Sequence, residues 1–203
     1  MRESLPLVFA CSDFVAQSCT RDPALLISLI ESGDLGRPLR AADFAARAAA
    51  VTTETPPSAA VGDPEFLASL RRWRRREMVR IAWRDLAGWS SLEDTLGELS
   101  WFADAAIRLA YERARQSLIA RYGEPRSASG AAQPLIILGM GKLGGGELNF
   151  SSDIDLVLLF PEHGETDGAR SIANEEFFTR LAQETVRLLK TPTPEGFVFR
   201  VDL

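Results

Sequence analysis

The chain has 203 residues, of which 46% are hydrophobic and 25% charged, and its formal net charge is −5. This composition is ordinary for a soluble globular protein of one or two domains, and the negative charge argues against a protein that coats nucleic acid. No segment reaches the roughly 18 apolar residues that cross a bilayer, and the N-terminus is a poor signal peptide. Cys11 and Cys19 fit neither a disulfide framework nor a zinc site, and we interpret them as small apolar residues. We expect a cytoplasmic protein in a reducing compartment, with no membrane segment and no nucleic-acid partner.

Residues 1–121 carry a helical pattern of apolar side chains. Asp22 followed by Pro23 is typical of a helix start, because aspartate caps free amides and proline fits the first helical position. Gly33 follows the next apolar run and indicates the end of that helix. The Thr-, Ala- and Pro-containing residues 48–64 predict a loop.

Further helices are predicted before residue 122. Asp63 and Pro64 indicate one start, and a capping box from Ser90 to Glu93 indicates another. Composition then shifts at residues 122–134, which predict a linker. The tryptophans of the helical segments are expected to pack in the core or between helices; these are Trp73, Trp83, Trp89 and Trp101.

The pattern beyond residue 134 is typical of strands and one helix. Residues 135–138 predict a buried strand and residues 154–160 a second. A loop is expected over residues 161–168 and a helix over 171–190. Residues 197–203 alternate apolar and polar side chains and predict a third strand.

The stretch from Gly139 to Asp155 reads Gly-Met-Gly-Lys-Leu-Gly-Gly-Gly-Glu-Leu-Asn-Phe-Ser-Ser-Asp-Ile-Asp and is the most distinctive in the chain. Glycines let a backbone approach phosphate closely. A P-loop is excluded because it needs a hydroxyl residue after Lys142, where the chain has Leu143. The glycine spacing fits a dinucleotide-binding fingerprint, but that motif opens a full helix, and its acid ends the next strand about 20 residues on. Here the aspartates come sooner, at the start of the strand, which argues against a Rossmann site.

The two aspartates instead favour a nucleotidyl-transfer site. Asp153 and Asp155 would share one strand face while Ile154 points into the core. Carboxylates at that spacing can share divalent metal ions. Asp202, on the third strand, is the natural third ligand. If the glycine turn and the aspartates form one site, the first two strands are expected to run antiparallel.

Several other polar residues have plainer interpretations. His163 is expected to be a solvated loop residue. Arg200 shares a strand face with Asp202, so it either pairs with a carboxylate or reaches a phosphate. A basic run predicts a solvated helix face, with a docking surface for an acidic partner as the alternative; it contains Arg71, Arg72, Arg74, Arg75 and Arg76.

The Gly139–Asp155 stretch resembles the signature of the bifunctional glutamine synthetase adenylyltransferase/adenylyl-removing family. Nearly the whole chain shares the resemblance, through the segments 12–15, 31–35, 70–86, 177–180, 191–193 and 196–202. It implies an α+β fold, in which a helical region at 1–121 and the linker precede a partial DNA-polymerase-β-like nucleotidyltransferase core at 135–203 with a small mixed sheet. Family members continue past the third strand, so we expect this chain to be a fragment with weak or no activity alone.

The resemblance also implies an activity and a site. The chain is more similar to the N-terminal half, which removes AMP from a tyrosine of glutamine synthetase by phosphorolysis and forms ADP. The catalytic carboxylates would be Asp153, Asp155 and Asp202, which would hold Mg²⁺ or Mn²⁺. The backbone at Gly144 and Gly145, with Ser151 or Ser152, would hold phosphate oxygens of a bound nucleotide, which would be AMP, ADP or ATP. Lys142 either adds a positive contact or is solvated. The implied partners are glutamine synthetase, a PII signal protein and inorganic phosphate; the alternative is a non-catalytic docking or regulatory module.

Overall fold

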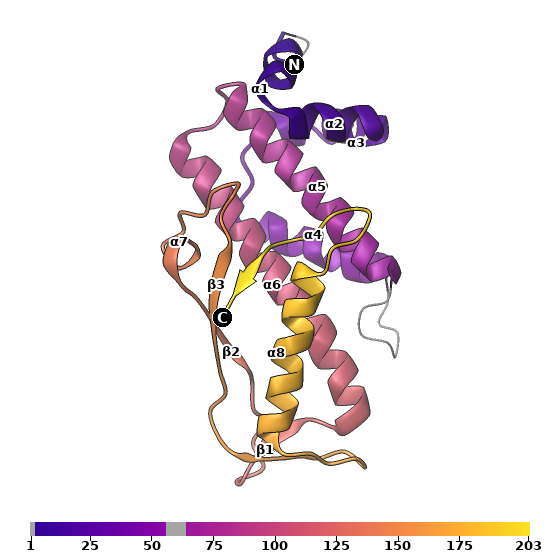
Figure 1. The fold of residues 1–203 in the computed structure, drawn as a ribbon, viewed down its shortest axis with the longest axis vertical. Coiled ribbons are helices and arrows are strands. Elements are labelled where there is room, and N and C mark those ends of the chain that lie inside the picture. The colour runs from indigo at the N-terminus through magenta and orange to yellow at the C-terminus, as the bar shows by residue number, and fades with distance from the viewer. Residues whose placement is uncertain (1–2, 56–63) are drawn as a thin grey trace.

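A computed structural model describes residues 3–55 and 64–203 and shows a helical body with small sheets along one side (Figure 1). The N-terminal elements are α1 (Leu5–Cys11), α2 (Asp13–Arg21), α3 (Pro23–Glu31), the 3₁₀ turn η1 (Asp34–Gly36) and α4 (Ala41–Glu54). The long helices α5 (Pro64–Leu86) and α6 (Leu92–Tyr122) follow. The C-terminal elements are β1 (Pro125–Ser127), β2 (Ile136–Gly139), α7 (Gly141–Gly144), β3 (Ile154–Leu159), β4 (Gly164–Thr166), α8 (Asn174–Lys190) and β5 (Val201–Asp202). The α+β prediction is confirmed at this coarse level.

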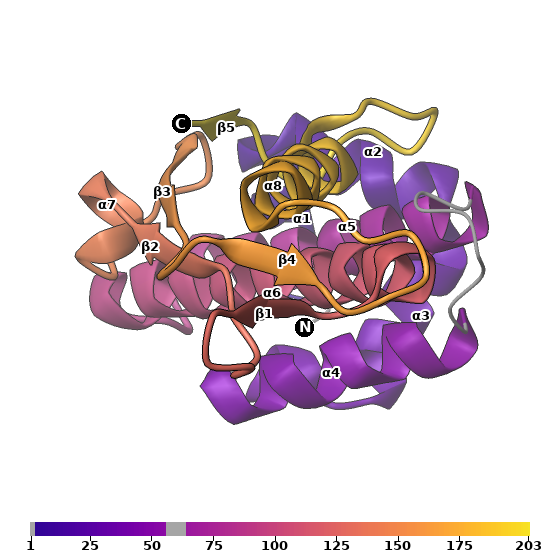
Figure 2. The same cartoon turned by 90° about the horizontal axis from the view of Figure 1, so that it is seen from below.

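Helix α6 is the centre of the packing. It contacts α4, α5 and α8, with α4 and α8 on opposite sides of it, and the sheets lie beside α6 and α8 (Figure 2). The main hydrophobic cluster runs from Phe44 and Trp73 through Phe102 to Ile154 and Phe177, so residues of the predicted helical region and of the predicted core share it. A smaller cluster joins α1, α2 and α3 to α5. Within the described residues, no helix is both long and apolar enough to cross a membrane.

The one strand direction that the sequence predicted is confirmed. In the sheet of order β2-β3-β5, β2 pairs antiparallel with β3, and β5 lies parallel to β3 on its other side. The antiparallel expectation is therefore confirmed. The predicted strand at 135–138 is not buried, however, because Ile136 and Leu138 are each more than two-fifths exposed. The third strand is also shorter than predicted, since β5 is confined to Val201 and Asp202.

Other predictions need correction at element boundaries. Helix α4 extends to Glu54, so the loop prediction for 48–64 is wrong over 48–54, and residues 56–63 lie outside the described part. The predicted linker carries β1, which pairs antiparallel with β4 inside the predicted loop 161–168. The strands β1 and β4 have three residues each, and tertiary contacts decide whether such short strands form.

Helix starts are confirmed more often than their caps. Helix α3 begins at Pro23, but the Asp22 side chain makes no capping bond. Helix α6 is capped by Ser91, which accepts a hydrogen bond from the Asp94 amide, one residue later than the predicted capping box. The predicted start Asp63 lies outside the described residues, whereas α5 does begin at Pro64. The helix predicted over 171–190 begins at residue 174.

The apolar and basic residues of the helical region are also partly corrected. Trp73 and Trp83 are buried as predicted and Trp101 packs against the main cluster, but Trp89 is 40% exposed. Cys19 is a core residue, and burial raises its pKa to about 11, while Cys11 is exposed. The prediction of a solvated arginine face is wrong, since only Arg72 of that run is exposed. The other four arginines of the run donate hydrogen bonds to carbonyl or carboxylate oxygens of residues distant in the sequence.

Candidate active site

The strand β3 brings two predicted carboxylates to the start of the sheet. Ile154 is fully buried, so Asp155 points to the opposite, exposed face of the sheet, and Asp153 precedes the strand. The parallel ladder pairs Asp155 directly with Asp202 of β5. The structure therefore juxtaposes the second and third predicted carboxylates on neighbouring strands, as the sequence led us to expect.

Asp153 has a different partner. The Arg200 Nε donates to its carboxylate, and Arg200 Nη2 donates to the Ser151 carbonyl oxygen at 3.1 Å. Of the two roles open to Arg200, pairing with a carboxylate is the one seen. Both side chains are partly exposed, at 62% for Arg200 and 39% for Asp153. Consistent with this pairing, the part of the chain that the structure describes contains no group of three or more acidic, His or Cys side chains gathered to hold a metal.

The glycine turn lies against Asp155. The Met140 amide donates to the Asp155 carbonyl oxygen at 2.8 Å and joins the turn to β3. Gly141 has φ of +51°, and a Cβ there would stand 2.9 Å from Asp155 Oδ2. Glycine is thus required at this position both by its left-handed conformation and by the nearby carboxylate.

Gly144 and Gly145 form the end of that turn. Their amides donate within it, to the carbonyl oxygens of Met140 at 3.0 Å and Gly141 at 3.1 Å. A Cβ on Gly144 would stand 2.5 Å from the Gly139 carbonyl oxygen. In this conformation the two glycines make the turn compact. The Lys142 side chain is exposed, so its ammonium group is accessible to a phosphate.

The two predicted serines are organised by a residue that the sequence reasoning missed. The hydroxyls of Ser151 and Ser152 both donate to Asn149 Oδ1, at 3.2 and 2.8 Å. The preceding residue, Leu148, is fully buried, and its amide donates to Ser100 of α6 at 3.1 Å. The Asn-x-Ser-Ser spacing is the available signal, because asparagine commonly bonds to groups two or three residues on.

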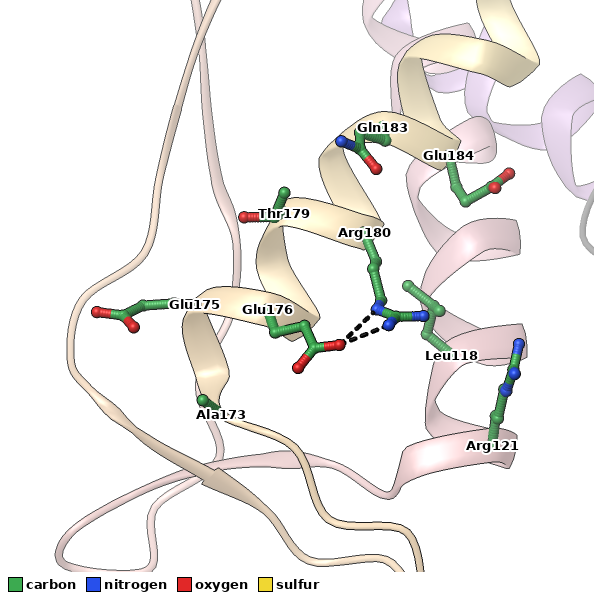
Figure 3. Close-up of a pocket in the computed structure, with 9 residues that line it drawn as sticks. All are labelled: Leu118, Arg121, Ala173, Glu175, Glu176, Thr179, Arg180, Gln183 and Glu184. Atoms are coloured by element: carbon green, nitrogen blue, oxygen red, sulfur yellow. Dashed lines mark hydrogen bonds and ion pairs between the residues drawn. The ribbon is translucent and has the colours of Figure 1, made fainter.

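The surface groove in Figure 3 is separate from these residues. It lies between α6 and α8, has a volume of about 680 Å³, and is lined by Leu118, Arg121, Ala173, Glu175, Glu176, Thr179, Arg180, Gln183 and Glu184. Glu176 and Arg180 bond to one another across one helical turn. His163, predicted to be a solvated loop residue, is 84% exposed, and its Nδ1 lies 2.7 Å from Glu175. Because the groove contains none of the predicted site residues and its charges are largely paired, size alone does not make it the active site.

A second groove adjoins the glycine turn. It has a volume of about 620 Å³ and lies between α6 and the sheet, where Gly139, Leu143 and Leu156 line one wall. Burial raises the pKa of Asp104 on the opposite wall. This groove lies next to the turn and not over the carboxylates, so it does not replace the β3–β5 face as the candidate site.

Comparisons with known proteins identify the family of the chain. The family model described as "Glutamate-ammonia ligase adenylyltransferase" matches residues 2–203. Proteins named "Bifunctional glutamine synthetase adenylyltransferase/adenylyl-removing enzyme" are 49% identical over 201 residues in Thioalkalivibrio sulfidiphilus and 46% identical over 210 residues in Nitrosococcus oceani. Each match covers 99% of this chain and 20% of the relative, so the chain spans about a fifth of the length of these relatives.

Proposed function

The chain belongs to the glutamate-ammonia ligase adenylyltransferase family, and we propose that it carries the nucleotidyl-transfer site of an adenylyl-removing enzyme. The observation that carries the proposal is the register of Asp155 with Asp202, beside a compact glycine turn. Two carboxylates on one exposed sheet face, next to a turn that a phosphate can approach, suit chemistry on a nucleotide. The polymerase-β-like character of the core is part of this proposal.

The donor set fits a hard divalent cation. Carboxylate oxygens are the ligands that Mg²⁺ and Mn²⁺ prefer, and Asp155 and Asp202 would hold the ion, joined by Asp153 once Arg200 releases it. When bound, the cation would neutralise charge on the phosphoryl oxygens. Because Arg200 already neutralises Asp153 in this structure, the carboxylates can lie close together without full mutual repulsion.

The proposed reaction is phosphorolysis of tyrosine-linked AMP on glutamine synthetase. An oxygen of inorganic phosphate bonds to the AMP phosphorus, the bond from phosphorus to the tyrosine oxygen breaks, and the tyrosine leaves as its hydroxyl after taking a proton, with ADP as the second product. Lys142, Ser151 and Ser152 would bind and orient phosphate oxygens. The backbone at Gly144 and Gly145 would let the phosphates approach closely.

The proposal that AMP is removed, and not added, rests on the sequence of the glycine segment, which resembles that of the adenylyl-removing half. A nucleotide bound as AMP or ADP, glutamine synthetase as substrate protein and a PII signal protein as regulator belong to the same proposal. An assay of adenylylated glutamine synthetase with phosphate distinguishes the directions, because removal releases ADP. The isolated chain is expected to be weakly active or inactive, so metal binding is the sharper first test.

We would measure Mn²⁺ binding by calorimetry in the wild type and in Asp155→Asn and Asp202→Asn variants. Each substitution removes a proposed ligand and should weaken binding by roughly tenfold or more. Glu175→Gln, an exposed carboxylate on α8 outside the site, is the matched control and should leave binding unchanged. Equal Mn²⁺ affinity in the wild type and both aspartate variants would refute the proposed site.

A further inference from the structure

The basic run of α5 faces the segment that leads to β5. Arg71, Arg74 and Arg75 are spaced three and four residues apart, which places them on one side of the helix. Each donates to a carbonyl oxygen within residues 188–198. That segment is the connection from α8 to the strand that carries Asp202. The arginines therefore join the helical region to the candidate active site.

Arg71 is the centre of these contacts. Its side chain is only 1% exposed. The guanidinium donates to Leu188 O at 3.0 Å, Thr191 O at 2.5 Å and Gly196 O at 3.2 Å, and also to Leu67 O of its own helix at 3.1 Å. Leu188 belongs to the last turn of α8, where free carbonyls and the helix dipole favour a cation. One buried side chain thus caps α8 and holds the turn that follows it.

Arg74 and Arg75 extend the same contact along the chain. Arg74 Nε donates to Val198 O at 2.6 Å, and its guanidinium lies over the Phe197 ring. Burial, together with the nearby charge of Arg75, lowers the pKa of Arg74 to about 10. Arg75 Nη2 bonds to both the carbonyl and the carboxylate of Glu195, at 3.1 and 2.5 Å. Burying guanidinium groups is costly unless their donors are satisfied, so the order of this segment and the arginine positions depend on each other.

The held segment leads directly to Asp202. Val198 and Phe199 are buried, and both amides donate to Leu189 O. The Arg200 carbonyl then accepts from the Ile154 amide at 3.0 Å and starts the pairing of β5 with β3. The ladder between β3 and β5 joins two residue pairs, Ile154 with Val201 and Asp155 with Asp202. Contacts of the segment that precedes β5 therefore contribute to its register.

We propose that Arg71, assisted by Arg74 and Arg75, is a positioning residue that sets Asp202 beside Asp155 and makes α5 part of the metal site. The proposal rests on the proposed function for the role of Asp202, but not for the placement of β5. The helical region then has a direct purpose in nucleotidyl transfer. The loss of Arg71 would leave the carboxylate on the chain but out of register with its neighbour.

The test compares substitutions on one helix. Arg71→Met removes the guanidinium but keeps an unbranched apolar stem, and Arg71→Lys keeps the charge with fewer directed donors. Arg72→Met is the matched control, because Arg72 is exposed and bonds locally to Ser69. Leu29→Ala, in the smaller hydrophobic cluster, lowers stability without touching residues 188–202 and controls for destabilisation alone. Urea unfolding would confirm that each variant is folded.

Two readouts separate placement from metal chemistry. Hydrogen exchange at the Ile154 amide reports β5 pairing, and Mn²⁺ affinity reports the assembled carboxylates. In Arg71→Met we expect exchange at Ile154 to quicken and Mn²⁺ affinity to fall, each by roughly tenfold or more, as expected for lost hydrogen bonds to a charged group. Arg71→Lys should restore part of both, and Arg72→Met and Leu29→Ala should change neither.

The outcomes are distinguishable. Wild-type exchange at Ile154 in Arg71→Met, or an equal change in Leu29→Ala, would overturn the positioning role. If Arg71→Met is not folded, the same comparison is made with Arg71→Lys, for which wild-type exchange and affinity would likewise overturn it. If the wild-type chain binds no Mn²⁺, the proposed metal site fails, and the exchange measurement still decides the placement of β5.

Discussion

Adjacent glycines in the turn after β2 should respond oppositely to alanine. At Gly144 a Cβ would stand 2.5 Å from the Gly139 carbonyl oxygen and 3.2 Å from its carbon, whereas ordinary contacts begin at 3.4 Å. Main-chain atoms on both sides of the turn would have to separate, and overpacking of this kind costs about 1–3 kcal/mol. At Gly145 the backbone is right-handed, with φ of −80°, and the nearest atom to a Cβ would be 3.6 Å away. Alanine there should stabilise by roughly 0.4–1 kcal/mol, because it restricts the unfolded chain.

Urea unfolding of Gly144→Ala, Gly145→Ala and the wild type measures this difference directly. The Gly144 variant should also bind Mn²⁺ more weakly, since the Met140 amide of the same turn bonds to Asp155. The Gly145 variant should keep wild-type Mn²⁺ affinity. If both alanine variants had the same free energy of unfolding, the steric account of the turn would be refuted.

Three further predictions follow from charged groups. Arg200→Gln should free Asp153, and because such partly exposed pairs contribute up to about 1 kcal/mol, Mn²⁺ binding measured by calorimetry should tighten by up to about fivefold at low salt; weaker binding would show that Arg200 supports the site. Arg80→Met should cost about 1–3 kcal/mol in urea unfolding, because the buried carboxylates of Glu77 and Glu98 lose their shared partner, although Glu77 keeps its ion pair with Arg47. Arg72→Met should stay within about 0.5 kcal/mol of the wild type. Burial would raise the pKa of Asp34, but the hydrogen bond from Arg76 and the charge of Arg47 outweigh it and lower that pKa. The contribution of Asp34 to stability is therefore present above its usual pKa of 3.8 and lost as the pH falls through the lower folded-state pKa. Between near-neutral pH and about pH 3, the free energy of unfolding should fall less in Asp34→Asn than in the wild type.

The sequence was most informative where a pattern is local. The alternation around Ile154 predicted that it is buried while Asp155 points the other way, and the structure confirms this arrangement. The antiparallel direction of β2 and β3 also followed, because the glycine turn and the aspartates were expected to form one site. The pairing of Asp202 with Asp155 could be anticipated only by treating the two strand ends as one site. The lengths of the strands could not be predicted from the sequence, because hydrogen bonding across the sheet sets them.

The arginines of α5 show why burial of a charged side chain could not be predicted from neighbouring residues in the sequence. In sequence, Arg71 and Arg72 are equivalent members of a basic run, yet one is buried and the other exposed. The difference comes from carbonyl groups more than 100 residues away, which satisfy the donors of Arg71. A guanidinium enters an interior only where such acceptors converge, and main-chain acceptors carry no residue type that a sequence pattern can signal. The arginines that predicted a solvated helix face thus join the helical region to residues 188–198, the segment that leads to Asp202.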